Sequence, residues 1–193
     1  MPEDSLATLG LLPAITDRWF GQLSEPQRHY HTLEHITAML RNVPEDAAHS
    51  RELIAAIWLH DIVYDMTAGD NEECSADQAA CDLAGSDVAI KVVQRLIMGT
   101  KRHEPSEHPL DALMSDLDLL ILSETPEAYQ TYAAQIRREY AHVPEDIYRA
   151  GRAQVLSQFL QAPIYQTERF ASREARAREN LASEIADLQS GSA

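Results

Sequence analysis

The chain has 193 residues, of which 45% are hydrophobic and 24% are charged, as is usual for a globular protein. Its net charge of −15 and pI near 4.8 would repel a polyanion, so we expect no nucleic-acid polymer among its partners. The sequence contains neither a basic and apolar leader nor an apolar run of membrane-spanning length. We therefore expect a cytoplasmic protein with no membrane partner.

Helical periodicity dominates the sequence, and the signals for β-strands are weak. Glycine is scarce, and the Val and Ile residues do not alternate with polar residues between turn signals. These features predict an all-α fold, and the length fits one domain over residues 1–193. The expected helices, in chain order, cover residues 5–20, 28–41, 46–63, 70–83, 86–98, 110–122, 126–142, 144–160 and 172–188.

Helix-capping residues set several of these boundaries. Ser5 and Ser86 are the expected N-caps of the first and fifth helices. Asp70 precedes Glu73 by three residues, which is the spacing of a capping box. Thr125 followed by Pro126 predicts an N-cap with proline in the first helical position. The helix over 46–63 is strongly apolar and is expected to be central and buried.

The two cysteines, Cys74 and Cys81, lie seven residues apart on one expected helix. That spacing is about two turns, or ~10 Å along the axis, which is too far for a disulfide within the helix. They do not form a CxxC pair. We expect both to be free thiols, buried and in a reducing compartment.

Four pairs of polar residues interrupt helices that are otherwise apolar. Burying such groups without a partner costs free energy, and a shared divalent cation would satisfy several of them together. The pairs are His31 with His35, His60 with Asp61, Glu72 with Glu73, and Asp116 with Asp118.

The spacing of these residues limits which of them can meet. His31 and His35 are four residues apart, so both rings are expected on one helix face. His60 and the adjacent Asp61 point about 100° apart on an ideal helix, and both can still reach one ion. Asp118 would close the site from a distant helix. The alternative for each histidine taken alone is a hydrogen-bonded structural or surface role.

The polar motifs, in this order, resemble the HD superfamily of metal-dependent phosphohydrolases. Tyr-His-Thr-Leu-Glu-His at 30–35 is similar to a segment of cyclic nucleotide phosphodiesterases. His60-Asp61 matches the adjacent His-Asp pair of metal ligands that is typical of the superfamily. Asp118-Leu119 is similar to the segment that contains the superfamily's last aspartate ligand. The wider text, including Tyr-Arg-Ala-Gly-Arg at 148–152 and Ala-Arg-Glu-Asn-Leu at 177–181, resembles a bacterial subfamily of predicted HD phosphohydrolases over nearly the whole chain.

The resemblance implies an HD-like helical bundle with a metal site between central helices. It assigns His35, His60, Asp61 and Asp118 as metal ligands, and it leaves His31 as a supporting or general-acid histidine. Thr32 stands where the phosphodiesterases have Asn, and the extra histidines of the cyclic-dinucleotide-cleaving branch are missing. Those two activities are therefore not supported.

A site of two imidazoles and two carboxylates suits a divalent metal. Mn²⁺, Fe²⁺, Co²⁺ and Ni²⁺ fit best, Mg²⁺ and Zn²⁺ are allowed, and a bridging Asp61 would support a second ion. Such an ion lowers the pKa of a bound water and polarises a phosphoryl oxygen. Asp116 is two residues from Asp118 and cannot share its helix face, so we expect it to support a ligand or to lie on the surface.

Five further residues have a functional and a structural interpretation. His31 would protonate the oxygen of the leaving group, or it only packs against its neighbours. Glu72 would orient or deprotonate the attacking water, or it is an acid favoured by the helix dipole. Lys101 and His103 would bind phosphate, or they belong to a solvated loop. Arg152 would face a phosphate, or it anchors the helix beside a glycine.

The expected function is metal-dependent hydrolysis of a phosphate ester or anhydride of a small molecule, with a nucleotide as one candidate. The alternative is a catalytically idle HD-fold protein that senses a nucleotide or a metal. A third interpretation is a structural helical protein with incidental histidines. The expected partner is a phosphorylated small molecule, and a homodimer is left open.

Overall fold

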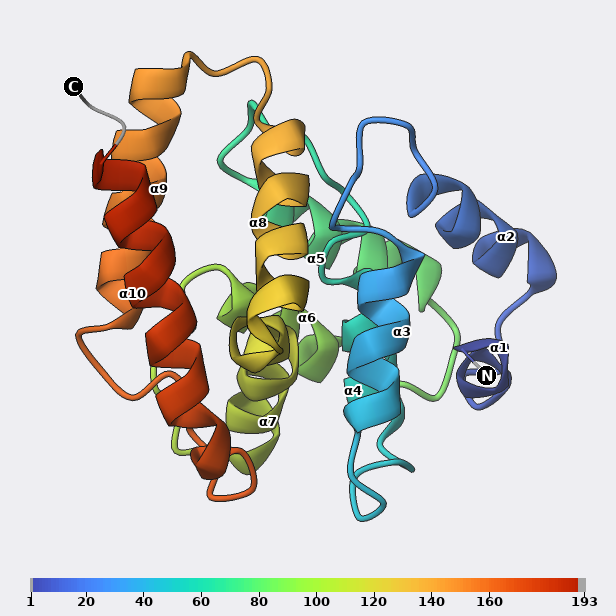
Figure 1. Cartoon of the computed structure of the whole chain (residues 1–193). Helices are drawn as coiled ribbons and strands as arrows, with labels where there is room; N and C mark the ends of the chain where they lie inside the picture. Colours follow the sequence, from blue (N-terminus) through green and yellow to red (C-terminus); the bar gives the residue numbers. More distant parts are fainter. Residues whose placement is uncertain (1, 191–193) are drawn as a thin grey trace.

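Every regular element in residues 2–190, the part of the chain that the computed structural model describes, is a helix (Figure 1). The prediction of an all-α fold is therefore confirmed. The α helices are α1 Pro2–Ala7, α2 Pro13–Gln22, α3 Leu33–Asn42, α4 Arg51–Leu59, α5 Asn71–Asp82, α6 Ile90–Thr100, α7 Pro109–Asp118, α8 Pro126–Glu139, α9 Glu145–Phe159 and α10 Glu174–Ser190. Two 3₁₀ helices, η1 Leu119–Ser123 and η2 Ala171–Arg173, complete the set.

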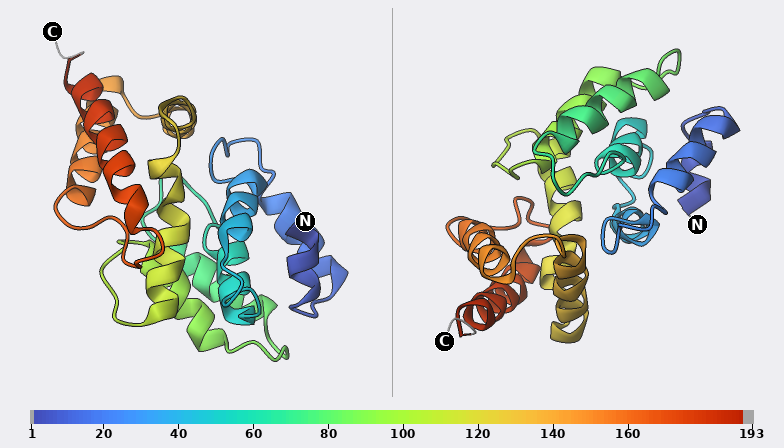
Figure 2. Two further views of the ribbon diagram at one scale, coloured as in Figure 1. Left: turned by 60° about the horizontal axis from the view of Figure 1, so that its bottom comes forward. Right: turned by 90° about the horizontal axis from the view of Figure 1, so that it is seen from above.

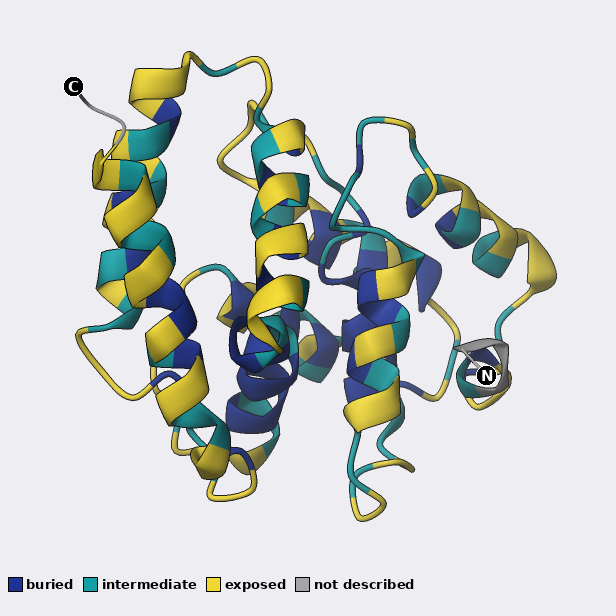
Figure 3. Ribbon diagram, viewed as in Figure 1, coloured by how far each residue is buried: buried dark blue, intermediate teal, exposed yellow. Residues whose placement is uncertain are grey.

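Helix α4 lies at the centre of the molecule, as its apolar sequence predicts. Every residue from Leu53 to Leu59 is buried, and the helix packs against α3, α5, α6 and α7. Helices α9 and α10 pack as a pair on one side, while α1 and α2 lie on the other (Figures 1 and 2). The buried residues face this interior, and the outward faces of α8 and α10 are largely exposed (Figure 3).

The predicted first helix, residues 5–20, is two helices. Gly10 has a φ of +65°, a backbone conformation that glycine adopts without steric cost, and it interrupts the helix. Pro13 then begins α2 at its first position, where its missing N–H is not needed. Ser5 lies within α1 and is not its N-cap; its hydroxyl accepts a hydrogen bond from Trp58 Nε1 at 2.9 Å.

Two of the helices that carry the predicted site are shorter than expected. Helix α3 begins at Leu33, because the Thr32 hydroxyl accepts from the Glu34 N–H and caps it there. Helix α4 begins at Arg51 after the Ser50 cap. It ends at Leu59, so the His-Asp doublet follows its last turn. The predicted starts at 28 and 46 are therefore wrong.

Of two other predicted caps, Ser86 is wrong, while Asp70 is confirmed as the N-cap residue of α5 but does not form the predicted capping box. The Ser86 hydroxyl donates to Leu83 O and accepts from the Val88 N–H, so it closes a turn, and α6 begins four residues later at Ile90. Asp70 occupies the N-cap position of α5 without a side-chain capping bond. Its expected partner Glu73 is bound to Lys101 instead.

The remaining boundaries are close to those predicted. The Thr125 hydroxyl accepts from the Ala128 N–H, and Pro126 begins α8, as the sequence indicated. The predicted helix over 110–122 ends at Asp118, where the backbone tightens into η1. Among the described residues, no helix is both long enough and apolar enough to cross a membrane.

Both cysteines are free, but the expectation that they are buried is wrong. Cys74 and Cys81 are exposed on α5. The buried face of that helix is formed by Ser75, Ala76, Ala79 and Asp82. Residues seven apart share a helix face, so one orientation of α5 places both thiols outward.

Candidate metal centre

Four predicted ligands lie together where α3, α4 and α7 meet. His35 comes from the first turn of α3, His60 and Asp61 follow α4, and Asp118 ends α7. His35 Nε2 lies 3.2 Å from His60 Nε2 and 3.0 Å from Asp118 Oδ1. His60 Nε2 lies 3.0 Å from Asp61 Oδ2 and 3.4 Å from Asp118 Oδ1. Residues up to 83 positions apart in the sequence thus share one site, called the His/Asp cluster below.

The chemistry and spacing of these atoms fit a divalent cation. The ligand atoms of His35, His60 and Asp61 all lie within 4.8 Å of one another. Ligand bonds of about 2.1 Å to one ion place neighbouring donor atoms roughly 3 Å apart, close to the spacing in the cluster. The histidine side chains are almost fully buried, whereas those of Asp61 and Asp118 are 18% and 16% exposed. That exposure leaves an approach from solvent through the carboxylates.

The orientation of His60 is fixed by the helix that precedes it. Its Nδ1–H donates to the Ile57 carbonyl at 3.0 Å, which directs Nε2 toward the carboxylates. Burial lowers the pKa of His60, but the charges of Asp61 and Asp118 outweigh burial and hold this pKa well above its ordinary value. The two carboxylates therefore favour positive charge at this point of the cluster.

His31 lies in the loop before α3, so the expectation that it shares a helix face with His35 is wrong. The two rings still approach each other, with centroids 6.2 Å apart. The Nδ1–H of His31 donates to Glu139 Oε2 at 2.7 Å, and the ring packs against Tyr64 at 4.3 Å. Burial lowers the pKa of His31, but Asp61 and Glu139 raise it above its ordinary value.

Glu139 is a site residue that the sequence interpretation missed. Its Oε1 accepts the backbone N–H groups of His29, Tyr30 and His31 at 2.7, 2.7 and 3.1 Å. Its Oε2 accepts from His31 and from the Tyr64 hydroxyl. Glu139 ends α8, and a carboxylate at a helix C-terminus opposes the helix dipole. That unfavourable position is the signal in the sequence that could have identified it.

Arg28 supports the same region and was also missed. Its buried guanidinium donates to the carbonyl oxygens of Asp61 at 2.6 Å, Ile62 at 2.9 Å and His31 at 3.2 Å. These bonds connect the loop before α3 to the segment after α4. A single side chain therefore holds His31 and the His-Asp doublet in fixed relation.

The structure brings His103 to the cluster. Its φ of +50° lies in the left-handed region, which is uncommon for a residue with a side chain. Its Nδ1 is 3.0 Å from Ser115 Oγ, and its Nε2 is 3.4 Å from Asp118 Oδ2. Burial lowers the pKa of His103, which favours a neutral ring. The strained backbone thus places a neutral imidazole beside the second oxygen of Asp118.

Lys101 is occupied by acidic neighbours. Its ammonium donates to both Glu73 oxygens at 2.7 and 2.6 Å and to Gly69 O at 2.7 Å. Glu72 Oε2 lies 3.5 Å from the same ammonium. The negative charge of Glu72 also acts on the His103 ring. Glu72 is therefore near the site, while the ammonium that was expected to meet a phosphate is neutralised.

Two other predicted residues have structural partners away from the cluster. Arg152 donates to both Glu184 oxygens at 2.9 and 3.2 Å and lies 5.2 Å from the centre of the Tyr132 ring. The fully buried Asp116 accepts the N–H groups of Gln166 and Thr167 at 2.7 and 2.8 Å and the Thr167 hydroxyl at 2.6 Å. Asp116 thus fixes the segment before η2, and its expected place near a ligand or on the surface is wrong.

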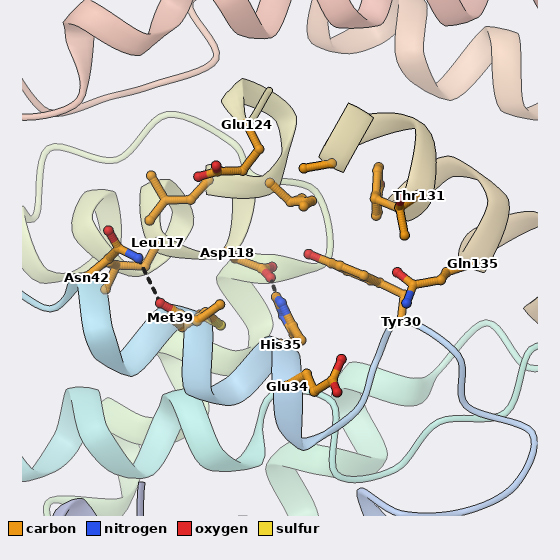
Figure 4. Close-up of a pocket in the computed structure, with 15 residues that line it drawn as sticks. Tyr30, Glu34, His35, Met39, Asn42, Leu117, Asp118, Glu124, Thr131 and Gln135 are labelled. Atoms are coloured by element: carbon orange, nitrogen blue, oxygen red, sulfur yellow. Dashed lines mark hydrogen bonds and ion pairs between the residues drawn. The ribbon is translucent and has the colours of Figure 1, made fainter. Parts of the chain in front are cut away.

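A cavity of about 460 Å³ opens beside the cluster, between α3, η1 and α8 (Figure 4). His35 and Asp118 belong to its wall, so cavity and cluster are continuous. The Tyr30 and Tyr132 rings, 4.6 Å apart, line the cavity near His35. We refer to this space as the α3/α8 cavity.

Comparisons with known proteins identified no relative of this chain. No protein-family model and no curated protein match the sequence, and no solved structure matches the fold. The described part of the chain is all-helical, and it brings together His35, His60 and Asp61, a group that could hold a metal ion, with Asp118 beside both histidines.

Proposed function

We propose that this chain is a metal-dependent phosphohydrolase of the HD type. The observation that carries the proposal is the His/Asp cluster, in which the Nε2 atoms of His35 and His60 lie 3.0–3.8 Å from each other and from oxygens of Asp61 and Asp118. The order of these residues is the one by which the sequence resembles the HD superfamily. The four side chains would hold the ion, with one or two ions bound.

The bound cation would supply positive charge to a phosphoryl oxygen and lower the pKa of a water. In the proposed reaction, the water oxygen bonds to phosphorus and the bond from phosphorus to the leaving oxygen breaks. That oxygen then takes a proton. A monoester gives an alcohol and inorganic phosphate, a diester gives an alcohol and a phosphate monoester, and an anhydride gives two phosphate-bearing products.

His31 would give that proton. Its Nδ1–H is committed to Glu139, so its remaining nitrogen, Nε2, is the one that can carry a transferable proton. The raised pKa of the ring favours its protonated form before the reaction. His103 is suited to donate a hydrogen bond to a phosphoryl oxygen beside Asp118, and Glu72 is proposed to orient the water.

The test combines metal analysis with a substrate panel. The purified chain is loaded in turn with Mn²⁺, Mg²⁺, Co²⁺ and Ni²⁺. Phosphate release is measured from monoesters and nucleotides, and release of the alcohol is measured from diesters such as bis-p-nitrophenyl phosphate. Stoichiometric metal and turnover with at least one substrate class are expected. Metal without any turnover would instead favour the idle, ligand-sensing alternative, and the absence of bound metal would reject both.

A further inference from the structure

The α3/α8 cavity is continuous with the proposed reaction centre, because His35 and Asp118 belong to both. A phosphoryl group held at the His/Asp cluster would therefore direct the rest of its molecule into this space. The volume of about 460 Å³ is within the range of sites that bind small organic molecules. The composition of the walls then indicates which organic groups fit.

Most of the wall is apolar. Met39, Leu117, Leu120 and Ile121 contribute side chains, and the Tyr30 and Tyr132 rings add aromatic surface. A few uncharged polar groups interrupt this surface, such as the hydroxyl of Thr131 and the amide of Gln135 (Figure 4). Such a wall favours an organic group with an apolar face and a small number of hydrogen-bonding atoms.

The charge of the described wall is negative. None of its residues is Lys or Arg, and two carboxylates besides Asp118 belong to it, Glu34 and Glu124. In Figure 4 they lie on either side of the His35–Asp118 pair. Glu124 is paired with Arg173 at 3.3 Å. Within the described residues, the exposed Glu34 carboxylate has no hydrogen bond or ion pair, so its charge is uncompensated.

The basic side chains that were expected to meet a phosphate, and Arg28 beside the cluster, are already paired. Lys101 is bound by Glu73, Arg152 by Glu184, and Arg28 by backbone carbonyl oxygens. Each additional phosphate group of a di- or triphosphate would bring further negative charge without a matching cation. A single phosphate at the cluster would need none of these side chains.

We propose that the substrate is a phosphate monoester whose organic part is uncharged or cationic and occupies the α3/α8 cavity, and that di- and triphosphates are rejected. This inference rests on the proposed function. Apolar contact with the cavity holds the organic part, while Glu34 repels any second phosphate.

The first test measures binding without turnover, by titration calorimetry on metal-depleted protein. The probes are four nucleosides, their 5′-monophosphates and their 5′-triphosphates. We expect nucleosides to bind at least tenfold more tightly than the matching triphosphates. Ala128→Phe, which fills the cavity from α8, should weaken nucleoside binding at least tenfold, and Ala38→Phe should repeat this from α3.

The charge is tested by Glu34→Gln. This variant should raise triphosphate affinity by about two- to fivefold, the size expected for one solvent-accessible charge, and so should narrow the ratio of nucleoside to triphosphate affinity. Glu179→Gln, an exposed residue of α10 outside the cavity, is the matched control and should change neither value. Equal nucleoside binding by the wild type and both cavity-filling variants would overturn the assignment of the cavity.

The second test compares kcat/KM for nucleoside monophosphates and p-nitrophenyl phosphate with that for triphosphates, using Mn²⁺-loaded protein. The monoesters should exceed the triphosphates by at least tenfold. If triphosphates are hydrolysed equally well or better, the inference is wrong while the proposed function stands. If no compound is hydrolysed with any metal, the proposed function fails and the substrate assignment fails with it.

Discussion

His31 and Glu139 lie 108 positions apart in the sequence, yet the Nδ1–H of His31 donates to Glu139 Oε2 at 2.7 Å. The same carboxylate accepts three consecutive backbone N–H groups from the loop that contains His31. Glu139 therefore positions both the ring and the backbone of this loop. The orientation of His31 toward the cluster depends on the packing of α8, not on the helix that follows it.

Replacing this carboxylate should destabilise the fold in a pH-dependent way. Burial raises the pKa of Glu139, but the hydrogen bond from His31 and the backbone N–H groups lower this pKa to about 2. Because the folded pKa is depressed, the stabilisation is complete above the unfolded pKa near 4.5 and is lost as the pH falls toward 2. Glu139→Gln should cost roughly 2–4 kcal/mol at pH 7.

Urea unfolding of the wild type and of Glu139→Gln at several pH values measures this effect. The difference between the two free energies of unfolding should shrink as the pH is lowered from 5 to 3. Glu127→Gln changes an exposed residue of the same helix and serves as the control. A difference that is the same at every pH would show that Glu139 does not act through its charge.

Removing a proposed ligand should remove the metal. Asp61→Ala deletes an oxygen 3.0 Å from His60 Nε2 and should reduce the bound metal to background after dialysis. His31→Ala should retain the metal, because His31 is bound to Glu139 and not to the ligand atoms. Elemental analysis measures the metal bound per chain in both variants, and Asp77→Ala, which changes an exposed residue of α5, is the control. Equal metal loss in both variants would make His31 a ligand.

If the proposed function holds, His31→Ala should lower turnover by roughly 10²–10⁴-fold, the usual contribution of a general acid. The loss should be smaller for substrates whose leaving group needs no proton, such as p-nitrophenyl phosphate. Comparison of kcat for this ester and for an alkyl phosphate tests the role. An equal loss for both esters would assign His31 to positioning instead of proton transfer.

Asp116 should stabilise the fold without affecting metal binding. Asp116→Ala leaves three partly buried donors of Gln166 and Thr167 without their acceptor, and it should cost roughly 1–3 kcal/mol. Urea unfolding measures the cost, with the exposed Asp17→Ala as control. The folded variant should bind as much metal as the wild type. Loss of metal at unchanged stability would mean that Asp116 belongs to the cluster after all.

Both thiols should react in the native protein. Cys74 and Cys81 are free and exposed, so a thiol reagent added to the folded, non-reduced chain should label two groups. Mass spectrometry counts the labels, and the Cys74→Ser variant should carry one. Labelling that appears only after unfolding would contradict the orientation of α5.

The sequence by itself determined the fold class, most helices and the identity of the four clustered side chains. Periodicity predicts helices because one buried face repeats every 3.6 residues, and the apolar run of α4 indicated the central element. The cost of burying charge indicated only that the polar pairs need partners. The resemblance to the HD superfamily then singled out His35, His60, Asp61 and Asp118 among them. Thr125 and Pro126 located the start of α8 because capping is a local interaction.

Tertiary structure decided everything that depends on distant partners. Asp116 and Asp118 look alike in the sequence, but packing directs one to the segment before η2 and the other to His35. Lys101 and Arg152 look available for a phosphate, and the fold pairs each with a glutamate. Glu139 reaches His31 only because α8 packs beside the loop before α3. Such pairings are long-range contacts, and no local pattern of residues encodes them.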